Sequence, residues 1–126
     1  MKKKGTVWID LYNCLYLVSS KYNEVEYLES PIFEIFDELD SSIINGLSME
    51  SLKFFLENDW ITEEQKKELN QFKQYLVGID DKYWNKIDFD LQEDWLFLKK
   101  WSISLMDKLG MKKKGWDSDG EQVIIV

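Results

Sequence analysis

An amphipathic pattern near the C-terminal end of the chain places the strongest constraint on the fold. Its large apolar residues recur every three or four positions, which puts them on one face of an α-helix. They are Leu91, Trp95, Leu98, Trp101, Leu105 and Leu109. Asp90 and Glu93 have the spacing of a capping box at the start of this helix, and Gly110 stands where a left-handed C-cap is needed. The pattern predicts a helix that buries one face against the rest of the chain.

The N-terminal segment has two interpretations. Its apolar residues follow helical spacing, so a first helix is predicted from Thr6 to Tyr22. The alternation from Val7 to Leu11 also fits a strand. Periodicity alone leaves both structures open for this segment.

Three more helices are predicted between these two segments. Ser30-Pro31 has the residue types of an N-cap and a first helical position, so it is expected to start the second helix, with Ile32 on the buried face. Ser48 is expected to cap a short third helix. Thr62 and Gln65 have capping-box spacing at the start of the fourth helix. An acidic connector is expected from 80 to 90.

These elements predict an all-α fold, a compact bundle of about five helices in which residues 1–126 form a single domain. A chain of 126 residues is too short to stabilise two such domains. The tail from 111 to 126 is expected to be partly irregular, and Val123 to Val126 can form a short strand.

The charge of the chain narrows the classes of function. Its formal net charge is −8, and all 16 positive side chains are lysines, with no arginine and no histidine. Nucleic acid and anionic membranes attract basic surfaces, so neither is an expected partner. Histidine is the commonest general base and metal ligand, and its absence argues against an enzyme. We therefore expect no catalytic residue, no cofactor and no metal site.

Cys14 is the single cysteine, which makes an intrachain disulfide impossible and indicates a reducing compartment. It lies among aromatic residues with no histidine to activate it, so a buried apolar role is expected. The first residues have the lysines and apolar run of a signal peptide, but Asp10 and Asn13 interrupt that run. A cytoplasmic location is expected.

Two acidic runs form the candidate partner-binding surface. Between Tyr22 and Leu52 there are eight carboxylates and no lysine, and a second run extends from Asp80 to Asp94. Carboxylates accelerate encounter with a cationic partner, and exposed aromatic residues supply anchors. A solvated face that keeps the protein soluble is the alternative interpretation. The candidate partner-binding residues are Glu34, Asp37, Glu38, Asp40, Asp80, Asp81, Tyr83, Trp84, Asp88 and Asp90.

The order of features from Phe33 to Gly110 resembles a family of small helical bacterial immunity proteins, which counter polymorphic and contact-dependent toxins. The features that carry the resemblance are Ile35-Phe36-Asp37-Glu38-Leu39-Asp40, the helix start Thr62-Glu63-Glu64-Gln65, Leu69 to Phe72, the acidic connector, Trp95 and the helix end Leu109-Gly110. The resemblance implies an all-helical inhibitor that covers the active site of a toxin, often a nuclease. It implies no particular binding residue, because these families diverge most on the surface that faces the toxin.

The leading hypothesis is a non-enzymatic immunity protein, a monomer that binds a basic protein toxin through its acidic surface. The alternative is a phage-encoded inhibitor that mimics nucleic acid and occupies the basic channel of a defence nuclease. Composition does not separate the two, because both require an acidic surface. A toxin gene beside this one would favour the first hypothesis, and phage structural genes would favour the second.

Overall fold

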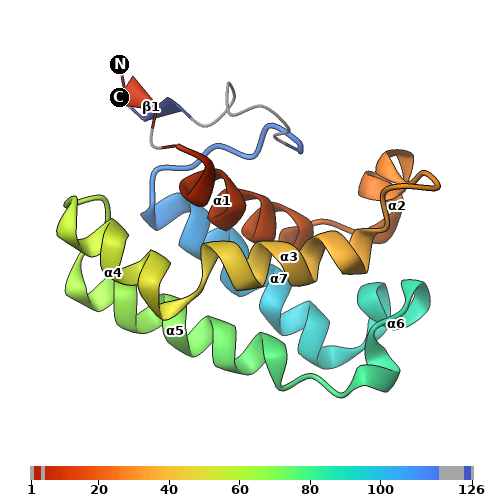
Figure 1. Cartoon of the computed structure of the whole chain (residues 1–126). Coiled ribbons are helices and arrows are strands. Elements are labelled where there is room, and N and C mark those ends of the chain that lie inside the picture. The colour runs from red at the N-terminus through yellow and green to blue at the C-terminus, as the bar shows by residue number, and fades with distance from the viewer. Residues whose placement is uncertain (1, 4, 117–123, 126) are drawn as a thin grey trace.

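Helix α1 (Thr6–Ser19) lies in the middle of the computed structural model, which describes residues 2–3, 5–116 and 124–125 (Figure 1). All residues from 11 to 20 are buried. Other parts of the chain therefore cover this helix on every side along these residues, and α3 (Ile35–Gly46) and α7 (Glu93–Lys108) pack against it. The all-α prediction and the helical interpretation of the N-terminal segment are confirmed.

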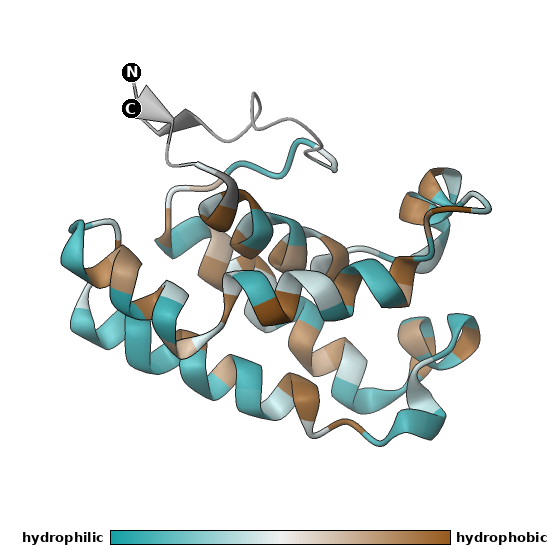
Figure 2. Ribbon diagram, viewed as in Figure 1, coloured by the Kyte–Doolittle hydropathy of each residue, from teal (hydrophilic) through white to brown (hydrophobic). Residues whose placement is uncertain are grey.

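Helices α4 (Met49–Glu57) and α5 (Glu63–Val77) begin where their capping residues predict. The Ser48 hydroxyl accepts a hydrogen bond of 3.0 Å from the amide three positions further along. Thr62 Oγ1 accepts from the Gln65 amide at 3.1 Å, and Gln65 Oε1 accepts from the Thr62 amide at 2.9 Å. Most of α5 is hydrophilic, and its buried residues recur at helical spacing on the face toward the bundle (Figure 2).

The described residues contain seven α-helices, where about five were predicted. The additional elements are the short helices α2 (Tyr22–Val25) and α6 (Lys86–Leu91) and the 3₁₀ turns η1 (Glu26–Leu28) and η2 (Asp81–Tyr83). Side chains stabilise the start of both helices: Glu24 accepts a hydrogen bond from the Lys21 amide at 2.8 Å, and Asn85 accepts from the Asp88 amide at 2.9 Å. The acidic connector expected from 80 to 90 is therefore partly helical.

Helix α3 begins later than its predicted start at Ser30-Pro31. Ser30 and Phe33 instead exchange backbone hydrogen bonds of 3.0 and 3.1 Å in a tight turn, which leaves Ile32 95% exposed. The prediction that Ile32 is buried is wrong. Proline is as favourable at the second position of a turn as at the start of a helix, so the sequence signal fits both structures. Glu34 is the actual N-cap.

Helix α7 also begins later than predicted, because Gln92 and not Asp90 is its N-cap. Gln92 Oε1 accepts a hydrogen bond from the Asp94 amide at 2.8 Å. Asp90 lies in α6, where its carboxylate accepts from the Tyr22 amide at 2.7 Å. Leu91 also belongs to α6 and is 71% exposed, so its predicted burial is wrong.

The rest of the α7 prediction is confirmed. Gly110 has a φ of 71°, a left-handed conformation that glycine adopts without strain. The other residues of the stripe are buried, apart from a half-buried Trp101: Trp95, Leu98, Leu105 and Leu109.

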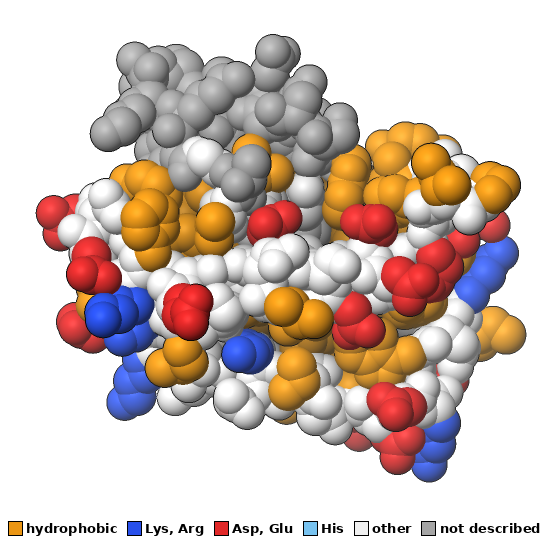
Figure 3. All heavy atoms as spheres, in the orientation of Figure 1, with side chains coloured by type: hydrophobic (Ala, Val, Ile, Leu, Met, Phe, Trp, Pro, Cys, Tyr) orange, Lys and Arg blue, Asp and Glu red, His pale blue; other side chains and the backbone are white. Residues whose placement is uncertain are grey.

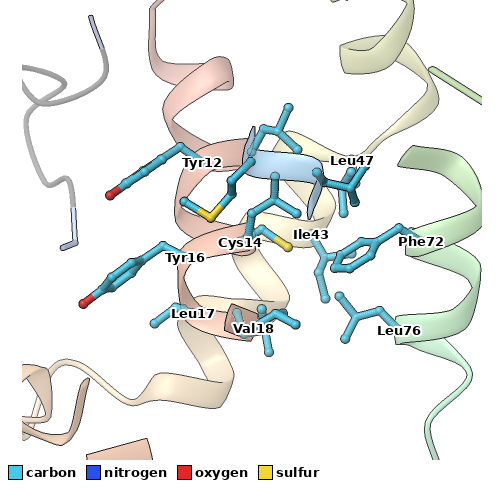
Figure 4. Packing of buried hydrophobic residues seen from close by; sticks show 14 of the residues in the cluster. Tyr12, Cys14, Tyr16, Leu17, Val18, Ile43, Leu47, Phe72 and Leu76 are labelled. Atoms are coloured by element: carbon cyan, nitrogen blue, oxygen red, sulfur yellow. The ribbon is translucent and has the colours of Figure 1, made fainter. Parts of the chain in front are cut away.

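Residues 111–116 lie against α1. The Tyr12 hydroxyl donates a hydrogen bond to the Gly115 carbonyl at 2.7 Å and accepts one from the Lys114 amide at 2.9 Å. In Figure 4 the Tyr12 and Tyr16 rings extend from the side of α1 that faces away from α5, whereas Cys14 points toward α3 and α5. Cys14 is fully buried, as predicted.

The ends of the described chain pair in a short ladder. Strand β1 (Lys2–Lys3) runs antiparallel to β2 (Ile124–Ile125), with Lys2 opposite Ile125. The other two residues of the predicted strand, Val123 and Val126, lie outside the described residues.

Candidate protein-docking site

The two acidic runs meet at one hollow on the protein surface. The hollow lies between α3, the end of α5 and η2, and it has a volume of about 300 Å³. Its lining residues are Phe36, Asp37, Asp40, Val77, Asp81 and Trp84. On this face, acidic side chains gather over α3 and over the segment that follows α5, with apolar side chains between them (Figure 3). The fold thus brings together carboxylates that are far apart in the sequence.

The start of α3 positions two of these carboxylates. The Glu34 carboxylate accepts hydrogen bonds from the amides of Phe36 and Asp37, both at 3.2 Å, and so fixes the first turn. Asp37 and Asp40 are three positions apart, which places them on one helix face, and both are exposed. Asp37 also lies in the first turn, where the helix dipole stabilises a negative charge.

Trp84 forms an aromatic wall of the hollow. Its indole N–H donates a hydrogen bond to the Ile79 carbonyl at 3.1 Å. Its ring meets Trp95 and Phe36 edge to face, with ring centroids 5.1 and 6.1 Å apart. These contacts leave Trp84 half-buried and hold its ring in one orientation.

The carboxylates of the hollow have no lysine partner among the side chains that the structure describes. The ion pairs among the described residues join Lys86 to Glu26 at 2.9 Å and Lys108 to Glu68 at 3.1 Å, and neither pair includes a residue that lines the hollow. The negative charge of the hollow therefore faces solvent. It is available to any cationic group that docks there.

Three of the predicted acids outside the hollow have local structural roles. The Asp80 carboxylate accepts a hydrogen bond from the Lys82 amide at 3.0 Å and starts η2. The Asp88 carboxylate accepts from the Asn85 side-chain amide at 2.6 Å. Asp90 ties α6 to α2 through the hydrogen bond that its carboxylate accepts from the Tyr22 amide. These contacts orient the carboxylates toward the protein itself.

Glu38 and Tyr83 also lie outside the lining. Glu38 is half-buried, and its negative charge raises the pKa of Asp10, although burial of Asp10 is the larger cause. Tyr83 is half-buried, and its carbonyl accepts a hydrogen bond from the Trp95 indole at 2.9 Å. Both predicted aromatic anchors, Tyr83 and Trp84, thus pack partly on the core.

Phe36 and Val77 line the hollow but were not among the predicted site residues. Phe36 directly precedes Asp37, so its position on α3 already places it close to an acidic candidate. Val77 is exposed at the end of α5, and no local pattern places it beside α3. Its position follows only from the packing of the helices.

A second hollow of about 340 Å³ is less suited to a cationic ligand. Its single carboxylate, Asp94, accepts a hydrogen bond from the Tyr75 hydroxyl at 2.6 Å and another from the Gln92 side-chain amide at 3.0 Å. These bonds lower the pKa of Asp94. The charge is therefore already stabilised within the protein.

Two buried groups with shifted pKa values lie away from both hollows. Burial raises the pKa of the Cys14 thiol to about 12, so the thiol stays protonated and unreactive. Lys99 Nζ donates to the carbonyls of Ser20 and Val18 at 2.8 and 3.4 Å, and it lies 3.4 Å from the centroid of the Phe89 ring. Burial lowers the pKa of Lys99 to about 7. Lys99 thus caps the end of α1, a role that no pattern in the sequence indicates.

Within the described residues, no three Asp, Glu, Cys or His side chains form a group that could hold a metal ion. No helix in the same part of the chain is both long and apolar enough to cross a membrane. The resemblance to immunity proteins remains a prediction from the sequence, because no protein-family model, curated protein or solved structure matches this chain.

Proposed function

We propose that this chain is an immunity protein that binds and neutralises a basic bacterial toxin, with a nuclease as the class of toxin that fits best. The observation that carries the proposal is the hollow, where Asp37, Asp40 and Asp81 lie beside two aromatic rings without a lysine partner among the described side chains. Nucleases are basic because they bind phosphate groups, so an acidic inhibitor associates with them rapidly.

The composition supports binding as the function instead of catalysis. The chain has no histidine and no arginine, and its only thiol, Cys14, is fully buried. In this proposal the protein acts in the cytoplasm as a monomer. It covers the active site of the toxin with the face that contains the hollow. Close charge pairs in a nuclease–inhibitor complex couple by about 1.5–7 kcal/mol, so a few carboxylates can dominate such an interface.

The test uses the product of the gene beside this one. Cells that produce it are supplied with the wild-type chain or with the double variant Asp37→Lys and Asp40→Lys. The matched control, Glu57→Lys and Glu64→Lys, makes the same charge change at exposed positions near the junction of α4 and α5. We expect the control to protect the cells and the hollow variant to fail. Its association rate at low salt should fall by about tenfold or more.

Equal protection by the hollow variant and the control variant would contradict the electrostatic mechanism. If phage structural genes surround this gene instead, the nucleic-acid mimic becomes the better proposal. That alternative is tested by competition between this chain and DNA for a basic defence nuclease, where displacement of DNA is the expected result.

A further inference from the structure

The hollow combines two kinds of surface that one class of side chain requires. Its walls include the rings of Phe36 and Trp84 and the side chain of Val77, and its other lining residues are three aspartates. Lysine and arginine carry a cationic group at the end of an apolar stem, so they bury the stem while the charge stays at a polar rim. An aromatic face adds a favourable interaction with the cation.

We propose that the hollow is a socket for a single lysine or arginine side chain of the partner protein. The volume of about 300 Å³ is at the small end of the range for ligand pockets, which fits one side chain better than a folded segment. The identity of the partner rests on the proposed function, whereas the chemistry of the socket rests on the hollow alone.

The socket is formed before any partner binds. Glu34 fixes the first turn of α3, and the indole of Trp84 is bonded to the Ile79 carbonyl. Little ordering of the α3 backbone or of the Trp84 ring is then needed on binding, which favours affinity. An anchor side chain that enters a rigid, partly apolar pocket is typical of the residues that dominate protein interfaces.

The chain does not fill the socket with a lysine of its own among the described residues. Lys82 is adjacent to Asp81, yet its Nζ lies 5.1 Å from the centroid of the Tyr83 ring and forms no ion pair in the described part of the molecule. Binding of an external cation therefore displaces no existing ion pair there. The negative charge around the rings remains uncompensated until a partner supplies a positive group.

The experiment uses three short peptides and the full chain. The peptides are acetyl-Gly-Arg-Gly-amide, its lysine counterpart, and the citrulline counterpart, which keeps the shape of arginine without the charge. Amide and indole N–H signals of the protein are followed by NMR during each titration. We expect saturable shifts at the Trp84 indole and at the amides of Asp37, Asp40 and Asp81 with arginine or lysine, and none with citrulline.

Two triple variants make the test specific. Asp37→Asn, Asp40→Asn and Asp81→Asn should weaken binding of the arginine peptide by about tenfold or more. The control Glu57→Gln, Glu64→Gln and Asp107→Asn removes three exposed carboxylates at the other end of the bundle and should bind as the wild type does. Shifts spread over all acidic surfaces, or unchanged binding by the hollow variant, would overturn the socket.

The outcomes separate the socket from the proposed function. If the chain protects cells from the toxin encoded by the adjacent gene but does not bind the charged peptides, it is an immunity protein without this socket. A chain that binds the peptides as expected but does not bind the toxin has the socket and a different partner.

Discussion

Gly46 of α3 packs directly on the backbone of Leu11 in α1. A Cβ atom on residue 46 would lie 2.5 Å from the Leu11 amide nitrogen and 2.7 Å from its Cα, distances that real Cβ atoms do not adopt. Gly46→Ala should therefore push the two helices apart and lower the free energy of unfolding by about 1–3 kcal/mol, measured by urea denaturation. Ser41→Ala, at an exposed position on α3, is the control and should be neutral or slightly stabilising. An equal loss in both variants would contradict this explanation.

The buried ammonium of Lys99 should make stability depend on pH. Burial lowers its pKa from 10.5 to about 7, while nearby Asp90 and Glu24 act to raise it and Lys113 to lower it. Between these two values the unfolded chain binds more protons than the folded chain, so the free energy of unfolding rises with pH. We expect an increase of about 2 kcal/mol from pH 7 to pH 9 relative to Lys99→Met.

Urea denaturation of both proteins from pH 6 to pH 9 measures this difference. Lys99→Met should be at least as stable as the wild type at pH 6, because it removes a buried charge whose solvation is lost on folding. Parallel pH profiles of the two proteins would contradict this prediction. They would mean that the folded protein keeps the ammonium charged over this pH range, because its two carbonyl acceptors and the Phe89 ring stabilise the charge.

Glu68 links α5 to α7. Its carboxylate accepts hydrogen bonds from the Trp101 indole at 2.8 Å and from Lys108 at 3.1 Å. Burial acts to raise the pKa of Glu68, but these two donors together lower it below its ordinary value of 4.5. The stability from Glu68 is thus present above pH 4.5 and is lost as the pH falls through the folded-state pKa.

Glu68→Gln should lower the free energy of unfolding by about 0.5–1 kcal/mol at pH 7 and by less at pH 3. Chemical denaturation at the two pH values checks this, with Glu57→Gln as an exposed control that should change little at either. A loss of equal size at both pH values would mean that the charge of Glu68 contributes nothing.

The Tyr12 hydroxyl holds residues 111–116 through two backbone hydrogen bonds. Tyr12→Phe removes both bonds, at a cost of about 0.5–1.5 kcal/mol for each, and should free this segment before the bundle unfolds. Trypsin should then cleave after Lys112, Lys113 or Lys114 faster than in the wild type. Tyr75→Phe loses a hydroxyl that bonds to Asp94 on the surface, and its cleavage rate there should be unchanged.

Capping signals in the sequence correctly predicted helix ends that are fixed by residues a few positions away in the chain. The capping box of Thr62 and Gln65 and the left-handed Gly110 are fixed by contacts within a few positions, so their residue types identify them. The helix start predicted at Ser30-Pro31 is wrong because a turn and a helix start use the same residues. Which one forms depends on tertiary packing.

The candidate site could be predicted only in part. The acidic runs that supply Asp37, Asp40 and Asp81 are visible in the sequence, but their convergence depends on how α3 packs near the end of α5. The burial of Lys99 has the same origin. It borders the predicted stripe, four residues after Trp95, and only the contacts of α7 with α1 place its ammonium at the end of that helix.

The pairing of Lys2 with Ile125 has a practical consequence. It holds both described ends of the chain together at one end of the bundle, far from η2 (Figure 1). A fluorescent label or an affinity tag attached at either end therefore leaves the hollow accessible. Fusions made at opposite ends of the polypeptide should capture the same ligand equally well.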